Sequence, residues 1–257
     1  MGDRFREQWE ANAEAFTDLI AGSGTPHHRQ ILNPCIEQLL GDVRGKKLLD
    51  AGCGEGYLSR YYARRGASVT AVDLSERLID TSRSLTEREG IVVKYRVGDV
   101  CHLDSIPDGE FDIVLANLLL PNVPCLREAL REFYRVLRTG GHLVFSIVHP
   151  AFNFYGPGSW EMGEKHHETG RRNGVYFKVD KYFDKREYER YWTTRSGERF
   201  PAAISFFHRT LGTYMNELTT SGFRLVAFRE PQPMADDAFF DRERRIPFFA
   251  VFKGEKE

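Results

Sequence analysis

The stretch LLDAGCGEGYLSRYYA, residues 48–63, places three glycines within five positions at the end of an apolar run. Asp50 precedes these glycines, and a segment with helical spacing follows them. Glycine loses more conformational freedom on folding than other residues, so such a cluster indicates a backbone that turns sharply or approaches a ligand closely. The stretch therefore predicts a strand, a glycine loop and a helix that together bind a nucleotide-like ligand.

Similar strand–helix alternation continues on both sides of this stretch up to Pro150. Apolar runs that do not alternate with polar residues are typical of strands buried on both faces. Strands are expected at residues 46–52, 68–74, 92–99, 111–117 and 142–150, and helices at residues 57–66, 75–90 and 123–141. This order predicts an α/β fold, with a parallel sheet and helices on both of its faces.

After Pro150 the amino-acid composition changes and the regular strand–helix alternation ends. Residues 151–200 are rich in glycine, aromatic and charged residues, and we expect a loop followed by one or two strands in 175–194. A helix is expected over residues 204–223, followed by strands at 224–230 and 246–254. The sequence thus predicts a single domain over residues 1–257, divided into a helical segment (1–40), a ligand-binding core (45–150), an insertion (151–200) and the end of the core sheet (201–257).

Composition and charge exclude several classes of protein. The net charge of −1 over 257 residues argues against a nucleic-acid-coating role. No apolar run approaches the roughly 20 residues of a membrane helix, and the charged N-terminus does not resemble a signal peptide. We expect a cytoplasmic protein with no membrane or nucleic-acid partner. Its four scattered cysteines include no C-x-x-C pair, which predicts free buried thiols and argues against a disulfide or zinc framework.

The acids at three predicted strand ends indicate which ligand the loop binds. The dinucleotide fingerprint G-x-G-x-x-G, counted from Gly52, requires a third glycine where Tyr57 stands. Asp50 would repel a pyrophosphate but suits a cationic group. Asp73 has the spacing of an acid that binds ribose hydroxyls, and Asp99 ends the following strand. An amino acid, a ribose and an adenine together make up S-adenosylmethionine.

These motifs resemble those of class I S-adenosylmethionine-dependent methyltransferases of the small-molecule type. The resemblance rests on LLDAGCGEG, VDLS, GDV, FDIVLANLLLPNV and LREFYRVLRTGGHLVFSIVHP, which occur in the family's order. With the last helix and two strands it covers about two-thirds of the chain. It implies a Rossmann-like, doubly wound sheet of seven strands in the order 3-2-1-4-5-7-6, with the seventh strand antiparallel.

The resemblance also implies roles for individual residues. Asp50 and the loop backbone would hold the amino-acid part of the cofactor, Asp73 the ribose, and Asp99 the adenine edge. The implied cofactor-binding set is Asp50, Ala51, Gly52, Cys53, Gly54, Gly56, Asp73, Leu74, Asp99, Val100, Asn117 and Leu118, and Arg29 is a further candidate that could pair with the cofactor carboxylate or have a surface role. The acids could instead cap helices or lie in an ordinary loop.

The sequence indicates the residues that would bind the methyl acceptor less clearly than those that would bind the cofactor. His149 and His208 are candidate general bases for a nucleophile that must lose a proton, and each could equally be a structural residue. Trp9 and Phe16 belong either to a lid over the cofactor or to an amphipathic helix on the core. Phe152, Tyr155 and Trp160 are expected in a substrate lid, although these aromatics could instead pack the insertion or make a homodimer contact. No metal site is expected, since His166 and His167 lack further ligands.

Together these features predict transfer of a methyl group from S-adenosylmethionine to a small-molecule acceptor, by in-line displacement, with nitrogen or oxygen favoured over carbon. S-adenosylhomocysteine would be the product. A non-catalytic regulator that binds the same cofactor remains an alternative. A nucleic-acid methyltransferase is the other alternative, although Asn117 is followed by three leucines rather than by the Pro-Pro-aromatic motif of base-modifying enzymes.

Overall fold

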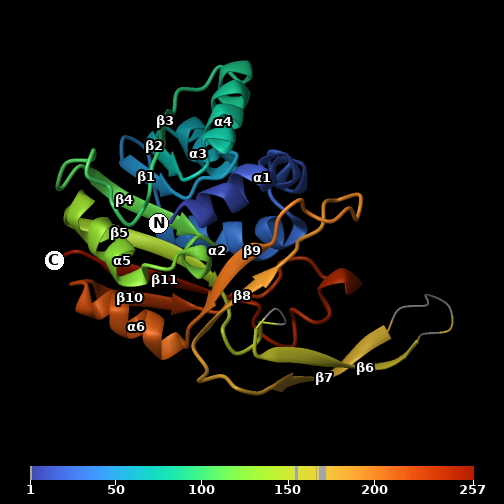
Figure 1. The fold of residues 1–257 in the computed structure, drawn as a ribbon. Coiled ribbons are helices and arrows are strands. Elements are labelled where there is room, and N and C mark those ends of the chain that lie inside the picture. Colours follow the sequence, from blue (N-terminus) through green and yellow to red (C-terminus); the bar gives the residue numbers. More distant parts are fainter. Residues whose placement is uncertain (1, 154–155, 166, 168–171) are drawn as a thin grey trace.

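The computed structural model describes residues 2–153, 156–165, 167 and 172–257, and these form an α/β fold around a seven-stranded sheet (Figure 1). Its strand order is β3-β2-β1-β4-β5-β11-β10, and β11 runs antiparallel to both of its neighbours. This confirms the predicted order, with β10 and β11 as its sixth and seventh strands. The strands are β1 (Lys47–Ala51), β2 (Ser68–Asp73), β3 (Lys94–Val97), β4 (Phe111–Asn117), β5 (Leu137–Val148), β10 (Arg224–Arg229) and β11 (Phe249–Glu255).

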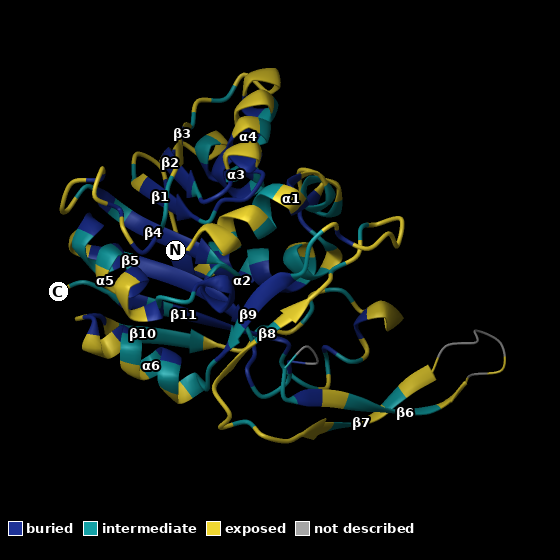
Figure 2. Cartoon of the chain, in the orientation of Figure 1, coloured by how far each residue is buried: buried dark blue, intermediate teal, exposed yellow. Residues whose placement is uncertain are grey.

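Helices bury both faces of this sheet. Successive side chains of a strand point to opposite faces, so Leu49 joins one apolar cluster while Leu48 joins another. The first cluster includes α5 (Leu126–Val136) and α6 (Leu211–Thr220), and the second includes α2 (Asn33–Leu40) and α3 (Tyr57–Arg64). A further helix, α4 (Glu76–Arg88), packs beside β2 and β3. Figure 2 shows the central strands as the most deeply buried part of the chain.

Two predicted helices have different limits in the structure. The helix expected over residues 123–141 ends at Val136, and β5 begins at the next residue. The prediction of a helix over 204–223 is wrong in its first part, where Ile204–His208 forms β9. This segment pairs antiparallel with β8 (Arg186–Arg190). Helix α6 starts only at Leu211, after Thr210 Oγ1 accepts a hydrogen bond from the Thr213 N–H at 3.1 Å.

The insertion contains a strand pair that begins earlier in the sequence than expected. Strands β6 (Gly158–Lys165) and β7 (Arg172–Val179) pair antiparallel and extend away from the body of the molecule (Figure 1). The expectation of loop structure holds for residues 151–153 and 156–157 but is wrong for residues 158–165 and 172–174, whereas the strands expected in 175–194 are present as part of β7 and as β8. Strand β9 pairs with β8 and not with the central sheet, so the first strand after residue 200 also lies outside that sheet.

The N-terminal segment divides into two parts with different packing. Helix α1 (Asp3–Ile20) contacts α4 and β9, whereas a π-helical turn η1 (His28–Leu32) and α2 pack into the core under the sheet. Two short 3-10 turns, η2 (Leu120–Asn122) and η3 (Ala238–Phe240), follow β4 and precede β11. None of the described helices combines the length and the apolar character needed to cross a membrane.

The cysteines correct one expectation. Cys101 and Cys125 form a disulfide, so the prediction of free thiols is wrong for this pair. The two residues are 24 positions apart, and the fold brings together the segment after β3 and the start of α5. Among the described residues, Cys35 and Cys53 are free and buried as predicted.

Candidate active site

The glycine loop leaves β1 at the carboxyl edge of the sheet. Gly52, Gly54 and Gly56 all have positive φ, at 69°, 58° and 79°. A Cβ at Gly52 would lie 2.5 Å from Leu119 Cδ1, and one at Gly54 would lie 2.7 Å from the Phe16 ring. Glycine is thus required here both by the backbone conformation and by close neighbours.

Two carboxylates flank this loop, a buried one on Asp50 and a half-buried one on Asp73. Asp50 is 2% exposed, and its Oδ2 accepts a hydrogen bond from Ser59 Oγ at 2.5 Å. Burial raises the pKa of the Asp50 carboxyl to about 6, although the Ser59 hydrogen bond opposes this rise. Asp73 accepts hydrogen bonds from the N–H groups of Gly54 (2.8 Å) and Ser75 (3.0 Å), and burial raises its pKa as well. A cationic ligand would stabilise the ionised forms of both acids.

The end of β3 contributes mainly through backbone and apolar groups. Gly98 and Val100 line the cavity described below, but Asp99 is not among the described residues that line it. Its Oδ1 accepts a hydrogen bond from the Cys101 N–H at 2.9 Å, which fixes the turn beside Val100. The Asp99 carboxylate and the sulfurs of Cys101 and Cys125 lie within 4.8 Å of one another. Because the sulfurs are bonded to each other, they are not available as thiolate ligands for a metal.

The end of β4 is held in an uncommon conformation. Leu118 has a φ of 54°, which is rare for a residue other than glycine. Its N–H donates to Ser146 Oγ at 2.9 Å, and the same hydroxyl donates to Asn117 Oδ1 at 2.6 Å. Asn117 Nδ2 reaches Tyr57 Oη at 3.4 Å. This network connects the end of β4 to the residue that follows the glycine loop.

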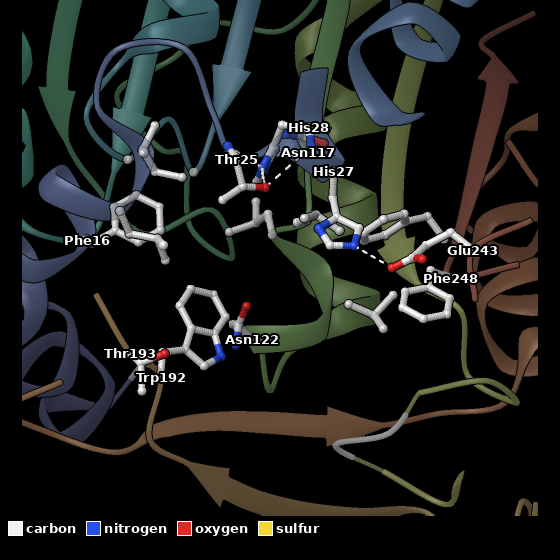
Figure 3. A pocket seen from close by; sticks show the side chains of 18 of the residues that line it. Phe16, Thr25, His27, His28, Asn117, Asn122, Trp192, Thr193, Glu243 and Phe248 are labelled. Carbon is white, nitrogen blue, oxygen red and sulfur yellow. Dashed lines mark hydrogen bonds and ion pairs between the residues drawn. The ribbon is translucent and has the colours of Figure 1, made fainter. Parts of the chain in front are cut away.

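A single cavity of about 1450 Å³ runs from the glycine loop to the insertion. Figure 3 shows Phe16 and Trp192 on one side of it, and His27, Glu243 and Phe248 on the other. Trp9, Phe16 and Trp192 contact one another, with ring centroids 5.5–6.3 Å apart. Helix α1 and the insertion therefore meet beside the glycine loop and cover one side of the cavity.

The structure brings most of the predicted cofactor-site and acceptor-site residues to this cavity. The lining includes Trp9, Phe16, Asp50, Gly52, Cys53, Gly54, Asp73, Leu74, Val100, Asn117, Leu118, Phe152 and Trp160. Of the other predicted residues that the structure describes, Ala51, Gly56, Asp99 and Arg29 are absent from the lining. Arg29 is exposed and donates a hydrogen bond to the Gly24 carbonyl oxygen. Tyr155 lies outside the described residues.

The two histidines predicted as bases do not belong to the described lining of the cavity. His149 is 3% exposed, and its Nε2 lies 3.0 Å from Glu230 Oε1. Burial lowers the pKa of His149, and the Glu230 carboxylate opposes this effect. His208 Nε2 lies 2.8 Å from the Tyr182 carbonyl oxygen. Both side chains are held by structural contacts, so the structure gives no support to their predicted catalytic role.

Comparison with known proteins agrees with this geometry. Residues 49–145 match the family model described as "Methyltransferase domain". The crystal structure of a putative S-adenosylmethionine-dependent methyltransferase from Listeria monocytogenes is 28% identical, with a TM-score of 0.72 over 87% of this chain and 96% of that one. The structure of a S-adenosylmethionine-dependent methyltransferase from Mesorhizobium loti is 26% identical, with a TM-score of 0.69 over 91% and 100%.

The chain belongs to the class I S-adenosylmethionine-dependent methyltransferases. A ubiquinone biosynthesis O-methyltransferase from Coxiella burnetii is 35% identical over 150 residues, which are 54% of this chain and 62% of that relative. The chain thus spans less than two-thirds of the length of this relative.

The chemistry of the described site fits the cofactor of this methyltransferase family. S-adenosylmethionine carries an ammonium group, a positively charged sulfur and two ribose hydroxyls. The two cationic groups are stabilised by negatively charged side chains, and the ammonium and hydroxyls donate to hydrogen-bond acceptors. Asp50 supplies a buried carboxylate and Asp73 a half-buried one, and each carboxylate oxygen can accept more than one hydrogen bond. Leu74 and Val100 supply apolar surface to the same cavity.

Sequence reasoning missed a close pair of polar residues in the methyltransferase cavity. His27 Nε2 lies 2.7 Å from Glu243 Oε1, and both residues line the cavity (Figure 3). The residues are 216 positions apart, and no motif connects them. The only local signal was the pair of adjacent histidines, His27 and His28, at the start of the segment that folds into η1.

Proposed function

We propose that the protein transfers the methyl group of S-adenosylmethionine to a small, planar acceptor that binds in the same cavity. The observation that carries the proposal is the continuity of one cavity between the glycine loop and the aromatic residues of the insertion. Pockets for drug-sized ligands measure about 300–1,000 Å³. A cavity of about 1450 Å³ has room for the cofactor and for a second small molecule beside it.

The chain's own residues align the two ligands and keep water out. S-adenosylmethionine, when bound, supplies a methyl group already activated by its positively charged sulfur. Asp50, Asp73 and the loop backbone would hold it, while Asn117 and Leu118 would line the side that faces the acceptor. Fixing two reactants in an orientation suited to reaction contributes several kcal/mol to rate acceleration, on the order of 7–11 in well-oriented systems.

Oxygen is the favoured receiving atom. The relatives from Coxiella burnetii are named as O-methyltransferases, although they match only 54% of this chain. The aromatic residues Phe152 and Trp160 line the acceptor part of the cavity and suit a flat ring, which prefers offset or edge-to-face contacts.

Calorimetric titration tests the cofactor part of the proposal. The purified protein is titrated with S-adenosylmethionine, S-adenosylhomocysteine and NADH, in parallel with Asp73→Ala. We expect micromolar binding of the first two ligands, none of NADH, and a large loss of affinity in the variant. Absence of binding by either S-adenosyl ligand would refute the proposal.

Transfer of a tritiated methyl group tests the acceptor class. S-adenosylmethionine labelled in the methyl group is incubated with the protein and either a panel of small aromatic hydroxyl and amine compounds or tRNA and DNA. We expect label in the small compounds only. Label in nucleic acid would identify the alternative class, and cofactor binding without transfer to any acceptor would favour a regulator.

A further inference from the structure

His27 and Glu243 form a close polar pair inside the cavity. His27 Nε2 and Glu243 Oε1 are 2.7 Å apart, and the side chains are 28% and 7% exposed. The second carboxylate oxygen of Glu243 is buried and has no hydrogen-bond partner among the described residues. A buried carboxylate with a single partner depends on that partner for compensation of its charge.

This contact determines which nitrogen of His27 carries a proton. An ionised carboxylate only accepts hydrogen bonds, so in the neutral imidazole Nε2 is the donor and Nδ1 keeps its lone pair. No residue in the described ranges hydrogen-bonds Nδ1. In Figure 3 this second ring nitrogen points away from Glu243, toward the side of the cavity where Phe16 and Trp192 lie.

Aromatic rings hold the imidazole in place. The ring of His27 is stacked on Phe248, with an angle of 7° between the planes and 6.1 Å between the centroids. Phe240 and Phe249 contact it edge-on, at 5.8 Å and 6.1 Å. Apolar walls of this kind limit the water around the ring and fix its orientation, so Nδ1 is presented to the cavity in one direction.

The neighbouring charged and titratable residues interact with groups other than the His27 imidazole. Burial lowers the pKa of the adjacent His28 to about 4, and its Nδ1 accepts hydrogen bonds from Thr25. Arg244 is paired with Asp241, and Arg242 donates to the Arg172 carbonyl oxygen at 3.4 Å. Glu243 is therefore the charged group in direct contact with the imidazole.

His28 connects this pair to the cofactor loop. Its ring lies 5.8 Å from that of Tyr57, the first residue after the three glycines. A Cβ at Gly24 would lie 2.6 Å from His28 Cβ, so the backbone packs tightly at this point. The segment that carries His27 is thus held against the glycine loop on one side, while Glu243 approaches from the loop that precedes β11.

We infer that His27 is the general base of the reaction, that Glu243 is the residue that positions it, and that the acceptor therefore carries an ionisable hydroxyl of the phenol or enol type. This inference rests on the proposed function. A neutral amine needs no base before it attacks, so a half-buried imidazole paired with a buried carboxylate in the cavity favours an acceptor that must lose a proton.

The step balances without any further reactant. The acceptor oxygen forms a bond to the methyl carbon, while the carbon–sulfur bond breaks and its electron pair stays on sulfur. The hydroxyl proton passes to Nδ1 of His27. The products are a methyl ether, S-adenosylhomocysteine and an imidazolium, whose charge Glu243 stabilises until the proton leaves to solvent.

A purely structural role predicts different behaviour. The pair also joins the N-terminal segment to the loop before β11, and in that role it would contribute to folding alone. Glu243→Gln separates the two roles, because the amide oxygen still accepts a hydrogen bond from Nε2 but the negative charge is lost.

The test uses a chromogenic acceptor analogue, 4-nitrocatechol, whose ionised form absorbs at longer wavelength than its neutral form. It is titrated into the complex of the protein with S-adenosylhomocysteine, at a pH at which the free compound is largely neutral. We expect the bound compound to ionise in the wild type and to stay neutral in His27→Asn. In Glu243→Gln the ionisation constant of the bound 4-nitrocatechol should be lower than in the wild type by about tenfold or more.

Turnover with unsubstituted catechol provides the second measurement. We expect His27→Asn to lower kcat by about 100-fold or more, with the KM for S-adenosylmethionine changed less than threefold. The exposed His102→Asn is the matched control and should leave both parameters unchanged. Binding of 4-nitrocatechol without ionisation, failure of the protein to bind it, or a His27→Asn variant with wild-type kcat would each overturn the inference. Cofactor binding measured by calorimetry would still stand, so the two proposals fail separately.

Discussion

Asp50 couples cofactor binding to pH. Burial raises the pKa of its carboxyl to about 6, so below that pH the ligand-free protein holds a proton there. A cationic ligand favours the ionised form, and binding below pH 6 must first release this proton. We expect the affinity for S-adenosylmethionine to rise by about tenfold between pH 5 and pH 7. Calorimetry across this range measures it, and Asp50→Asn should flatten the profile. An unchanged slope in the variant would contradict the assignment.

Arg60 stabilises the glycine loop through hydrogen bonds to the carbonyl oxygen and the carboxylate of Glu55. Its guanidinium is 2% exposed and lies 2.7 Å from Glu55 Oε2, in a side chain that is fully buried. Removing one partner of a buried pair leaves an uncompensated charge, so Arg60→Ala should lower the free energy of unfolding by about 3–5 kcal/mol.

Urea unfolding measures this effect, with Arg64→Ala as the matched control. Arg64 pairs with Glu89, but its side chain is 52% exposed, so its loss should cost less than about 1 kcal/mol. Equal losses in the two variants would show that the buried pair contributes no more than a surface pair.

Side chains that the sequence identified and those that it missed differ in how they reach the site. Asp50 and Asp73 lie at strand ends next to the glycine loop, where a local motif reveals them. His27 and Glu243 meet only because the loop before β11 folds back onto the N-terminal segment. His149 also follows a strand end, but its imidazole turns to Glu230 rather than into the cavity. The position of a residue at a strand end thus predicted that it lies at the ligand-binding edge of the sheet, but not whether its side chain points into the cavity.

At the scale of elements, α1 closes over the cofactor loop. Phe16 lies so close to Gly54 that a Cβ there would be 2.7 Å from the ring. We expect Phe16→Ala to weaken binding of S-adenosylmethionine by about tenfold, since it removes the aromatic cover and its contact with Trp192.

Calorimetry checks this prediction with Phe5→Ala as the control. Phe5 is on the same helix but packs on Phe207, with 5.7 Å between the ring centroids. The control should bind the cofactor normally. If both variants lose affinity equally, α1 acts on the site only through the overall stability of the fold.

The elements that were predicted correctly are those with their own periodic signal. The central strands are continuous apolar runs, and α4 is capped by Ser75, whose hydroxyl accepts a hydrogen bond from the Leu78 N–H at 3.2 Å. The segment Ile204–His208 has no such independent signal. It is apolar and precedes a true helix, and only its pairing with β8 makes it a strand. Strand pairing within the insertion depends on contacts distant in sequence, which local patterns do not contain.

At the scale of the whole molecule, the Cys101–Cys125 disulfide joins two neighbouring walls of the site. Cys101 follows Val100 in the segment after β3, and Cys125 precedes α5 and follows the η2 turn. Scattered cysteines in the sequence did not indicate this pair, because only the parallel arrangement of β1 to β4 brings the two segments together. The cross-link therefore constrains the folded edge of the sheet that carries the cofactor side of the cavity.

Removing this cross-link should lower global stability without changing the fold. A disulfide that closes a loop of about 25 residues restricts the unfolded chain by about 3 kcal/mol at 25 °C. We expect reduction, or the double substitution Cys101→Ser and Cys125→Ser, to lower the free energy of unfolding by about that amount, as measured by urea denaturation with and without a reductant. The double variant is its own control, because the reductant should change it no further. A wild type that responds to the reductant no more than the double variant would show that this pair is not joined in solution.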